Sequence, residues 1–274
     1  MSHEVRLLIS DVDGTILNPH KELSKANIAA VRRLQAAGIQ FALISARPVQ
    51  GMKWLIDALR VQAVCAGFNG GLIVNPDLSV VEEHDLPESS VPALEGIVRQ
   101  HKLDLWVYTR DRWFVPSLDA YHVQHDAQTV RFQPKVFPGF DRLNPKEIVK
   151  LVGISEDFDA VEACEQSVKA QFGESLSATR SQAQYVDITH SQANKGSAVE
   201  AIAAALNVPL KQVATIGDAD NDIEMFHKSG VSIAMGQSMP EVRRAAVLTT
   251  LSNTDDGVAW AIDKLILGSS TDQI

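Results

Sequence analysis

The sequence predicts an α/β fold with a mostly parallel sheet, interrupted by an inserted α+β domain. Near both ends of the chain, short apolar runs alternate with segments of helical periodicity, a pattern typical of parallel strands joined by helices. Between about residue 82 and residue 189 the regular alternation of apolar runs and helical segments stops, and the composition changes: all three tyrosines fall there. The two outer segments therefore form one domain, and the middle segment forms another.

The first segment is predicted to alternate strands with helices. Val5 to Ser10 is an apolar run that ends at a turn, as expected of a buried strand. Ser24 can cap a helix that ends at Gly38, because a serine oxygen accepts a bond from the first turn and glycine lets the backbone leave the helix. The next predicted elements are a strand at 40–45, a helix at 48–60 and a strand at 63–66.

The middle segment mixes its elements differently, and the α/β alternation then returns. In the middle segment we predict strands at 103–109, 150–155, 176–180 and 184–188, with helices at 88–101 and 157–172. Afterwards we predict a helix at 195–207, strands at 213–217 and 231–235, and a closing helix at 256–267. We expect residues 269–274 to be frayed. Helices should cover both faces of the parallel sheet.

The charge and the cysteine content exclude several classes of protein. With 25 basic and 34 acidic residues, the chain carries a formal charge of −9, which disfavours binding to nucleic acid. Cys65 and Cys164 lie far apart and have no C-x-x-C spacing, so we expect neither a disulfide framework nor a cysteine zinc site. Residues 1–6 contain no long apolar stretch, and no apolar run of about 18 residues occurs. We expect a soluble, cytoplasmic protein with no membrane partner, whose oligomeric state the sequence leaves open.

Two acidic residues, Asp11 and Asp13, follow the first predicted strand directly. Side chains two residues apart point the same way if the backbone stays extended. Two carboxylates that close repel each other unless a divalent cation binds them or one is protonated. The alternative is a plain Asp-Gly turn. A hairpin, however, needs a second strand at once, whereas residues 18–21 and a helix follow here.

A second acidic cluster stands at the end of another predicted strand, far later in the chain. Asp218 follows the strand at 213–217 as Asp11 follows its own, and Asp220 and Asp222 come close behind. Ligands of open parallel sheets bind at the carboxyl ends of the strands, so the two clusters should meet. A few oxygen ligands with room for water suit Mg²⁺. Asp220 can also be interpreted as a solvated loop carboxylate.

Ser45 and Lys195 stand at a strand end and at a helix start. A hydroxyl and free backbone N–H groups at a helix start suit a phosphoryl oxygen, although an ordinary capping serine fits Ser45 equally well. Lys195 opens a helix, where a cation opposes the helix dipole. Such local violations often mark functional residues. A solvated lysine is the alternative.

Together these clusters resemble the motifs of the haloacid dehalogenase (HAD) superfamily, and more closely its Cof-type, class IIB sugar-phosphatase-like branch. The matching motifs are Asp11-Val12-Asp13-Gly14-Thr15, Ser45-Ala46-Arg47, Lys195-Gly196 and Gly217-Asp218-Ala219-Asp220-Asn221-Asp222. Further similar stretches are Asn69-Gly70, Ala234-Met235-Gly236 and residues 252–259. The resemblance implies a Rossmann-like core domain, 1–83 and 188–274, with a C2-type α+β cap domain at 84–187.

The resemblance also implies a role for each motif residue. Asp11 would attack phosphorus, and Asp13 would protonate the leaving oxygen and then activate water. Asp11, the Asp13 carbonyl and Asp218 would hold Mg²⁺, with Asp222 supporting that site. The residues that would hold the phosphoryl group are Ser45, Lys195 and Asn221.

The expected activity is that of a Mg²⁺-dependent phosphatase of small phosphorylated metabolites, sugar phosphates first among them, acting through an aspartyl-phosphate. A phosphomutase of the same fold and a non-catalytic metabolite sensor are the alternatives. A sensor is expected to have lost a catalytic acid, whereas Asp11 and Asp13 are both present. A mutase would release little net phosphate.

Two positions depart from the family pattern, and one cap residue is singled out. The second motif is more often Thr-Gly-Arg, so Ala46 adds a methyl group beside the phosphate. Gln237 stands where an asparagine is usual. Arg180 lies shortly before the second crossing between the domains, where it could hold a polar group of the substrate. An exposed strand arginine is the alternative reading of Arg180.

Overall fold

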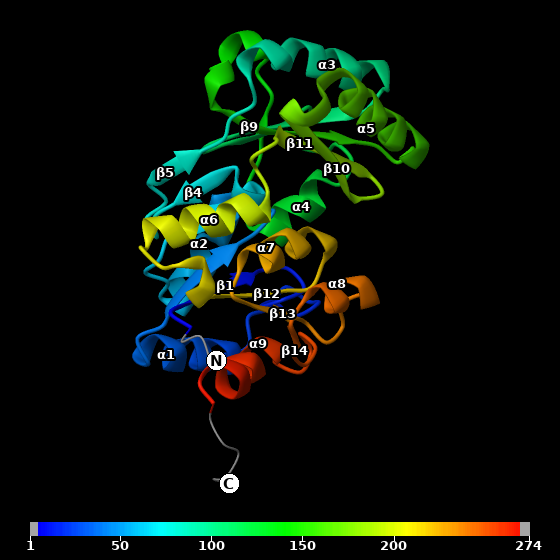
Figure 1. Cartoon of the computed structure of the whole chain (residues 1–274). Coiled ribbons are helices and arrows are strands. Elements are labelled where there is room, and N and C mark those ends of the chain that lie inside the picture. Colours follow the sequence, from blue (N-terminus) through cyan, green and yellow to red (C-terminus); the bar gives the residue numbers. More distant parts are fainter. Residues whose placement is uncertain (1–4, 269–274) are drawn as a thin grey trace. The chain divides into compact units, whose positions relative to one another are not determined.

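The computed structural model describes residues 5–268, which divide into two units (Figure 1). The first unit runs as far as Val81 and resumes at Asn194, and the second comprises Glu82–Ala193. Residues 269–274, expected to be frayed, lie outside the described part of the chain. Within residues 5–268, no helix is long and apolar enough to cross a membrane.

The first unit is built on a sheet in the order β14-β13-β12-β1-β2-β3-β4-β5. From β14 to β3 all neighbouring strands are parallel, and β4 pairs with β3 in the antiparallel sense. The fold class predicted from the alternation of strands and helices is thus confirmed. The strands are β1 (Leu7–Asp11), β2 (Gln40–Ile44), β3 (Cys65–Gly67), β4 (Leu72–Val74), β5 (Val80–Glu83), β12 (Val213–Gly217), β13 (Val231–Ala234) and β14 (Leu248–Thr249).

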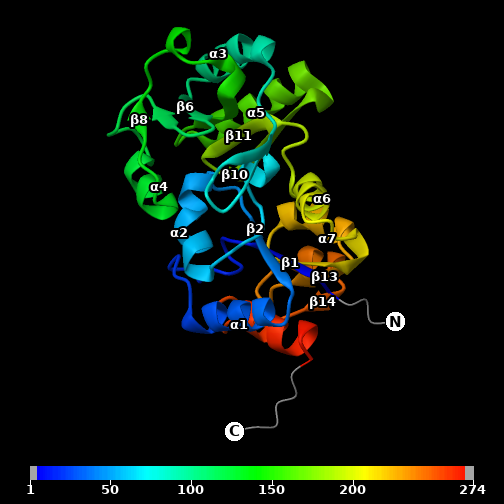
Figure 2. The ribbon, with the colours of Figure 1, turned by 90° about the vertical axis from the view of Figure 1, so that its left-hand side faces the viewer.

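Helices cover both faces of this sheet, which explains why its central strand, β1, begins with three consecutive apolar residues, Leu7 to Ile9. All five residues of β1 are buried. α1 packs against α9, and α6 packs against α7, on opposite sides of the strands (Figures 1 and 2). The helices are α1 (Lys25–Ala36), α2 (Val49–Leu59), α6 (Lys195–Ala205), α7 (Ile223–Lys228), α8 (Pro240–Ala245) and α9 (Gly257–Ala261), which continues into a π-helical turn at Ile262–Ile266.

The predicted start of α1 is confirmed in its atomic detail. The hydroxyl oxygen of Ser24 accepts a hydrogen bond from the backbone N–H of Asn27, at 3.0 Å. This bond satisfies one of the amide groups that the first helical turn leaves without a partner. The side chain of Asn27 in turn donates to the carbonyl of Ile16, at 3.0 Å, and so ties α1 to the loop that follows β1.

The second unit is an α+β domain with a sheet in the order β10-β11-β9-β6-β7-β8. Its neighbouring strands are antiparallel except for the parallel pair β7 and β8. The strands are β6 (Asp104–Thr109), β7 (Trp113–Val115), β8 (Lys135–Val136), β9 (Ile148–Ile154), β10 (Leu176–Gln182) and β11 (Tyr185–His190). The helices are α3 (Val91–Gln100), α4 (Val123–Val130) and α5 (Phe158–Phe172).

The two faces of this second sheet carry different side chains. α3 and α5 pack together over one face, against apolar residues such as Val107 and Val186. The alternation along a strand turns Trp106 and Tyr185 to the other face, where α4 lies (Figure 1). The ring centroids of Trp106 and Trp113 are 5.1 Å apart, and both rings are buried. These large aromatic residues therefore form part of the unit's interior.

Candidate active site

The first unit brings the two acidic clusters together at one edge of its sheet. β1 and β12 are adjacent and parallel, with Ser10 paired with Ile216, so Asp11 and Asp218 leave the sheet at the same edge. Ligand oxygens of Asp11, Asp218 and Asp222 all lie within 4.8 Å of one another. This arrangement follows from the parallel order of the strands, as expected from the sequence.

Lys195, the first residue of α6, lies between two of these carboxylates. Its Nζ donates to Oδ1 of Asp11 and to Oδ1 of Asp222, both at 2.6 Å, and the side chain is only 2% exposed. Burial alone would lower the pKa of Lys195, but the two carboxylates outweigh it and raise that pKa. Burial raises the pKa of Asp11, and Lys195 opposes that rise. The three groups form a buried charge cluster that keeps Lys195 protonated.

Asp222 holds the loop that follows β12. Its Oδ2 accepts the backbone N–H groups of Asp218 and Ala219, at 2.8 and 2.9 Å. Gly217 is required at this point, because a Cβ on it would lie 2.4 Å from Cγ of Asp222. Both oxygens of Asp222 are therefore engaged, by Lys195 and by the loop backbone. Asp222 orients the loop that carries Asp218.

Asp218 is positioned from the opposite side by the loop that follows β1. Thr15 Oγ1 donates to Asp218 Oδ1 at 2.7 Å. Burial, followed by the charge of Asp222, raises the pKa of Asp218 to about 6 even though the bond from Thr15 opposes the rise. Gly14 has a φ of +84°, and a Cβ there would lie 2.2 Å from Oδ2 of Asp218. Only glycine allows this approach of the two loops.

Asp13 is held by two cations. Arg47 Nη2 and Lys21 Nζ both reach Oδ1 of Asp13, at 2.7 and 2.8 Å. Burial would raise the pKa of Asp13, but the hydrogen bonds and charges of Arg47 and Lys21 together hold it below its usual value. No role for Lys21 was predicted from the sequence, where the only signal was a lysine in the short loop behind the acidic pair. In the structure, the backbone of Lys21 has a φ of +59°.

Ser45 and Asn221, the other predicted phosphate contacts, lie beyond the ends of β2 and β12. Ser45 is buried, and its Oγ accepts the backbone N–H of Arg47 at 3.1 Å. Among residues 5–268 the Ser45 hydroxyl has no hydrogen-bond acceptor, so its proton could be donated to a ligand. Asn221 is exposed, and its Nδ2 donates to Oδ1 of Asn69 at 3.4 Å. Both residues lie in the first unit, on loops that follow β2 and β12, the two strands on either side of β1.

Gln237, which departs from the family pattern, connects three loops of the first unit. Its Nε2 donates to the carbonyl of Gly14 at 2.7 Å, and its Oε1 accepts the backbone N–H of Asn253 at 3.0 Å. Asn253 Nδ2 reaches the carbonyl of Leu17 at 2.9 Å. The glutamine therefore braces the loop that carries Asp13, a role that the sequence did not reveal.

Arg180, the predicted cap contact, is paired within the second unit. It lies on β10 and bonds to two carboxylates of α5, Glu165 Oε2 at 3.0 Å and Glu162 Oε2 at 3.2 Å. These ion pairs give the guanidinium a structural role between strand and helix. Contact of Arg180 with a substrate stays a prediction.

The chain is similar to haloacid dehalogenase-like hydrolases over nearly its whole length. The family model described as haloacid dehalogenase-like hydrolase matches residues 8–262. The Bacillus subtilis protein YwtE, named as a 5-amino-6-(5-phospho-D-ribitylamino)uracil phosphatase, is 25% identical over 287 residues, covering 96% of this chain and 99% of that protein.

Two solved structures agree with the fold over nearly the whole chain. A haloacid dehalogenase-like hydrolase from Bacteroides thetaiotaomicron has a TM-score of 0.88 and 26% identity, covering 96% of this chain and 100% of the other. BT4131, described as a HAD subclass IIB sugar phosphatase, has a TM-score of 0.82 and 19% identity, covering 95% and 99%. The family model spans almost all of the described residues, including every motif of the acidic site. The chain belongs to the haloacid dehalogenase-like hydrolase family.

Proposed function

We propose that this protein is a Mg²⁺-dependent phosphatase of small phosphorylated metabolites, acting through a phosphoryl group carried on Asp11. The observation that supports it best is the buried ion pair of Asp11 and Lys195 at the carboxyl edge of the parallel strands, where Lys195 Nζ lies 2.6 Å from Asp11 Oδ1. A carboxylate can approach a phosphate only where cations offset the negative charge of both. Lys195 supplies one such cation.

The donor set of the acidic site fits Mg²⁺. Three carboxylates, Asp11, Asp218 and Asp222, face a single bonded ammonium group, that of Lys195, so two negative charges are left uncompensated. Asp11, Asp218 and the Asp13 carbonyl would hold the ion, since both oxygens of Asp222 are already engaged. A small number of hard oxygen ligands suits Mg²⁺. When bound, the ion would offset the charge that develops on the phosphoryl oxygens.

In the first half of the proposed reaction, a carboxylate oxygen of Asp11 forms a bond to phosphorus while the bond from phosphorus to the ester oxygen breaks. The carboxyl group of Asp13 gives its proton to the departing oxygen. Lys195 attracts the phosphoryl oxygens, and the Ser45 hydroxyl and the Asn221 amide donate hydrogen bonds to them. Splitting one difficult displacement into two easier ones is the advantage of the covalent intermediate.

In the second half, the Asp13 carboxylate takes a proton from water, and the oxygen of that water bonds to phosphorus. The bond between phosphorus and Asp11 breaks, which releases inorganic phosphate and restores the free carboxylate. The lowered pKa of Asp13 keeps its carboxylate deprotonated and so able to accept a proton, although it also makes the carboxylate a weaker base. Its acidic role in the first half requires a proton that the contacts with Arg47 and Lys21 oppose. A poor leaving group departs only when it is protonated, so substrates with poor leaving groups should depend most on Asp13.

We propose that the second unit, predicted as a cap at 84–187, selects the substrate by its leaving group. The motif residues of the acidic site all lie in the first unit and would hold the phosphoryl group, which every substrate shares. YwtE is named for a substrate with a phosphorylated ribityl chain, and BT4131 is described as a sugar phosphatase. Phosphate esters of sugars and sugar alcohols are therefore the substrate class to test first.

A phosphatase assay on the full chain tests this function. The purified protein would be given nitrophenyl phosphate and a panel of sugar phosphates, nucleotides and cofactor phosphates, with Mg²⁺ or with excess EDTA. We expect phosphate release that chelation abolishes and Mg²⁺ restores. A metabolite sensor would release none, a mutase would isomerise a sugar phosphate with little net release, and full activity in EDTA would refute the metal dependence.

A further inference from the structure

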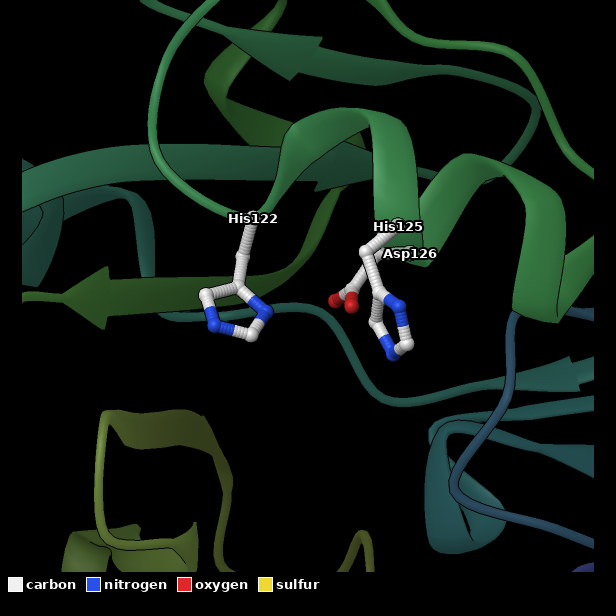
Figure 3. A group of neighbouring side chains, drawn as sticks. All are labelled: His122, His125 and Asp126. Carbon is white, nitrogen blue, oxygen red and sulfur yellow. The ribbon is translucent and has the colours of Figure 1, made fainter.

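The first turn of α4, in the second unit, brings together two imidazole rings and a carboxylate that the proposed phosphatase chemistry does not use. His122 is the residue that precedes the helix, and His125 and Asp126 follow it three and four positions later. His122 itself lies outside the helix, with a left-handed φ of 60°, and this backbone turn leaves its ring beside the first helical turn. Figure 3 shows the Asp126 carboxylate between the two rings. The ligand atoms of the three side chains all lie within 4.8 Å of one another.

A second observation at this cluster points to a missing ligand. Nδ1 of His122 is buried and has no hydrogen-bond partner among the described residues. Buried polar atoms are nearly always paired, so this atom requires an explanation. In Figure 3 a ring nitrogen of His122 is turned toward the Asp126 carboxylate. A cation placed between these groups would accept the unused lone pair of the ring.

The surroundings of the cluster already hold two of its three members in place. Tyr185 of β11 donates its hydroxyl proton to the Asp126 carboxylate, with the oxygen 3.0 Å from Oδ1. The ring of Tyr121 lies edge-on to the ring of His122, with centroids 4.2 Å apart. Carboxylates that bind metal ions are usually oriented by such outer hydrogen bonds. The exposed His125 is the member that can still rotate.

We propose that His122, His125 and Asp126 form a binding site for a divalent transition-metal ion of the zinc type, with a fourth position open to water. Two imidazole nitrogens and one carboxylate oxygen are a donor set that zinc accepts readily. Mg²⁺ prefers oxygen ligands throughout, so this site would not compete for the ion of the acidic cluster.

The spacing of the ligand atoms is compatible with a site that closes around its ion. With tetrahedral bonds of about 2.0–2.1 Å, ligand atoms lie about 3.3 Å from one another. The separation of up to 4.8 Å therefore has to shrink, and a rotation of the exposed His125 side chain can provide this.

The experiment is a Zn²⁺ titration of the full-length protein, with Mg²⁺ in excess so that the acidic cluster is occupied. The ring ¹⁵N signals of histidine are followed by NMR, and the affinity is measured by calorimetry. We expect the signals of His122 and His125 to shift and to saturate at one equivalent of Zn²⁺. His227, an exposed histidine of the first unit, should keep its signal unchanged.

Substitutions separate the ligands from the outer support. Tyr185→Phe should weaken Zn²⁺ binding about 10-fold or more, as is typical for an outer contact. His125→Ala and Asp126→Asn should each weaken it further than that, whereas His227→Ala should leave it unchanged. Because His125 is exposed, its loss should not unfold the protein. Unmoved His122 and His125 signals, or equal affinity of His125→Ala and the unsubstituted protein, would overturn the proposal.

Discussion

Adding a single methyl group at Gly14 should disable the acidic site without unfolding the protein. In Gly14→Ala, the new Cβ would lie 2.2 Å from Oδ2 of Asp218, well inside any allowed contact. The Asp218 carboxylate would have to move by about 1 Å or more, away from the position that Thr15 gives it. Misplacement of a reacting or ligating group by about 1 Å can cost about 100-fold in rate.

The chain offers a matched control for the backbone part of this change. Gly38 has nearly the same φ, +81° against +84°, but a Cβ there would have no atom within 4 Å. Both Gly14→Ala and Gly38→Ala force an alanine into a left-handed conformation, at a cost of about 1–2 kcal/mol in the free energy of unfolding. Only the substitution at Gly14 also displaces Asp218. The difference between the two variants therefore isolates that displacement.

The assay combines urea unfolding with turnover of nitrophenyl phosphate over a range of Mg²⁺ concentrations. We expect Gly38→Ala to lose stability but to keep its turnover, and Gly14→Ala to lose about 100-fold in turnover and to need more Mg²⁺. If Gly14→Ala worked within threefold of Gly38→Ala at every Mg²⁺ concentration, Asp218 would not be a ligand whose position matters, and our reading of the site would be refuted.

Four further predictions concern single side chains. Lys195→Met removes the ammonium group bonded to the buried carboxylates of Asp11 and Asp222 and should lower the free energy of unfolding in EDTA by about 3–5 kcal/mol, against less than about 1 kcal/mol for the exposed Lys228→Met; equal losses in a urea titration would contradict the buried cluster. Asp13→Asn should slow the single-turnover burst far more for alkyl phosphates than for nitrophenyl phosphate, and equal slowing would remove Asp13 from the acid role. Arg180→Ala should raise the KM for the natural substrate and spare nitrophenyl phosphate turnover; a parallel change for all substrates would speak against a role in selectivity. Burial, followed by the charge of Glu83, raises the pKa of Asp85 to about 7, so the native state binds the extra proton and its stability should fall as the pH rises from about 4 to about 7; this fall in the urea midpoint should be smaller in Asp85→Asn, and an identical pH profile would contradict the raised pKa.

The meeting of the two acidic clusters could be predicted because it depends on topology alone. Each cluster follows an apolar run, and parallel strands end at one edge of their sheet, so Asp11 and Asp218 had to come together. The start of α1 could be predicted equally well, because a serine directly before a helical pattern commonly caps the helix. These predictions required only strand ends and caps.

The contacts of Asp13 could not be predicted, because they depend on the path of loops. Lys21 reaches Asp13 from a backbone with φ of +59°, which lysine seldom adopts and no periodicity indicates. Gln237 could be noticed only as a departure, and its bond to the Gly14 carbonyl comes from the packing of two distant loops.

The helix α4 could not be predicted from the sequence, for a different reason. Of its eight residues only Val123 and Ala127 are buried, which is too few apolar positions for a recognisable period. The cluster of His122, His125 and Asp126 was therefore invisible before the helix was known. Short strands such as β7 and β8 were missed likewise, because two or three residues give no alternation to detect.

The most direct test of the proposed mechanism is the identification of the phosphorylated residue. The protein would be mixed with a phosphate ester and Mg²⁺, quenched within one turnover and reduced with borohydride, which marks an acyl phosphate, before peptide mass spectrometry. With nitrophenyl phosphate, whose leaving group needs little protonation, Asp13→Asn should increase the trapped fraction, because it slows the attack of water more than the first step. We predict that the mark falls on Asp11 and disappears in Asp11→Asn. Two results would contradict the assignment of Asp11 as the nucleophile. One is a mark on another residue, and the other is turnover of the ester with no marked peptide in the unsubstituted protein or in Asp13→Asn.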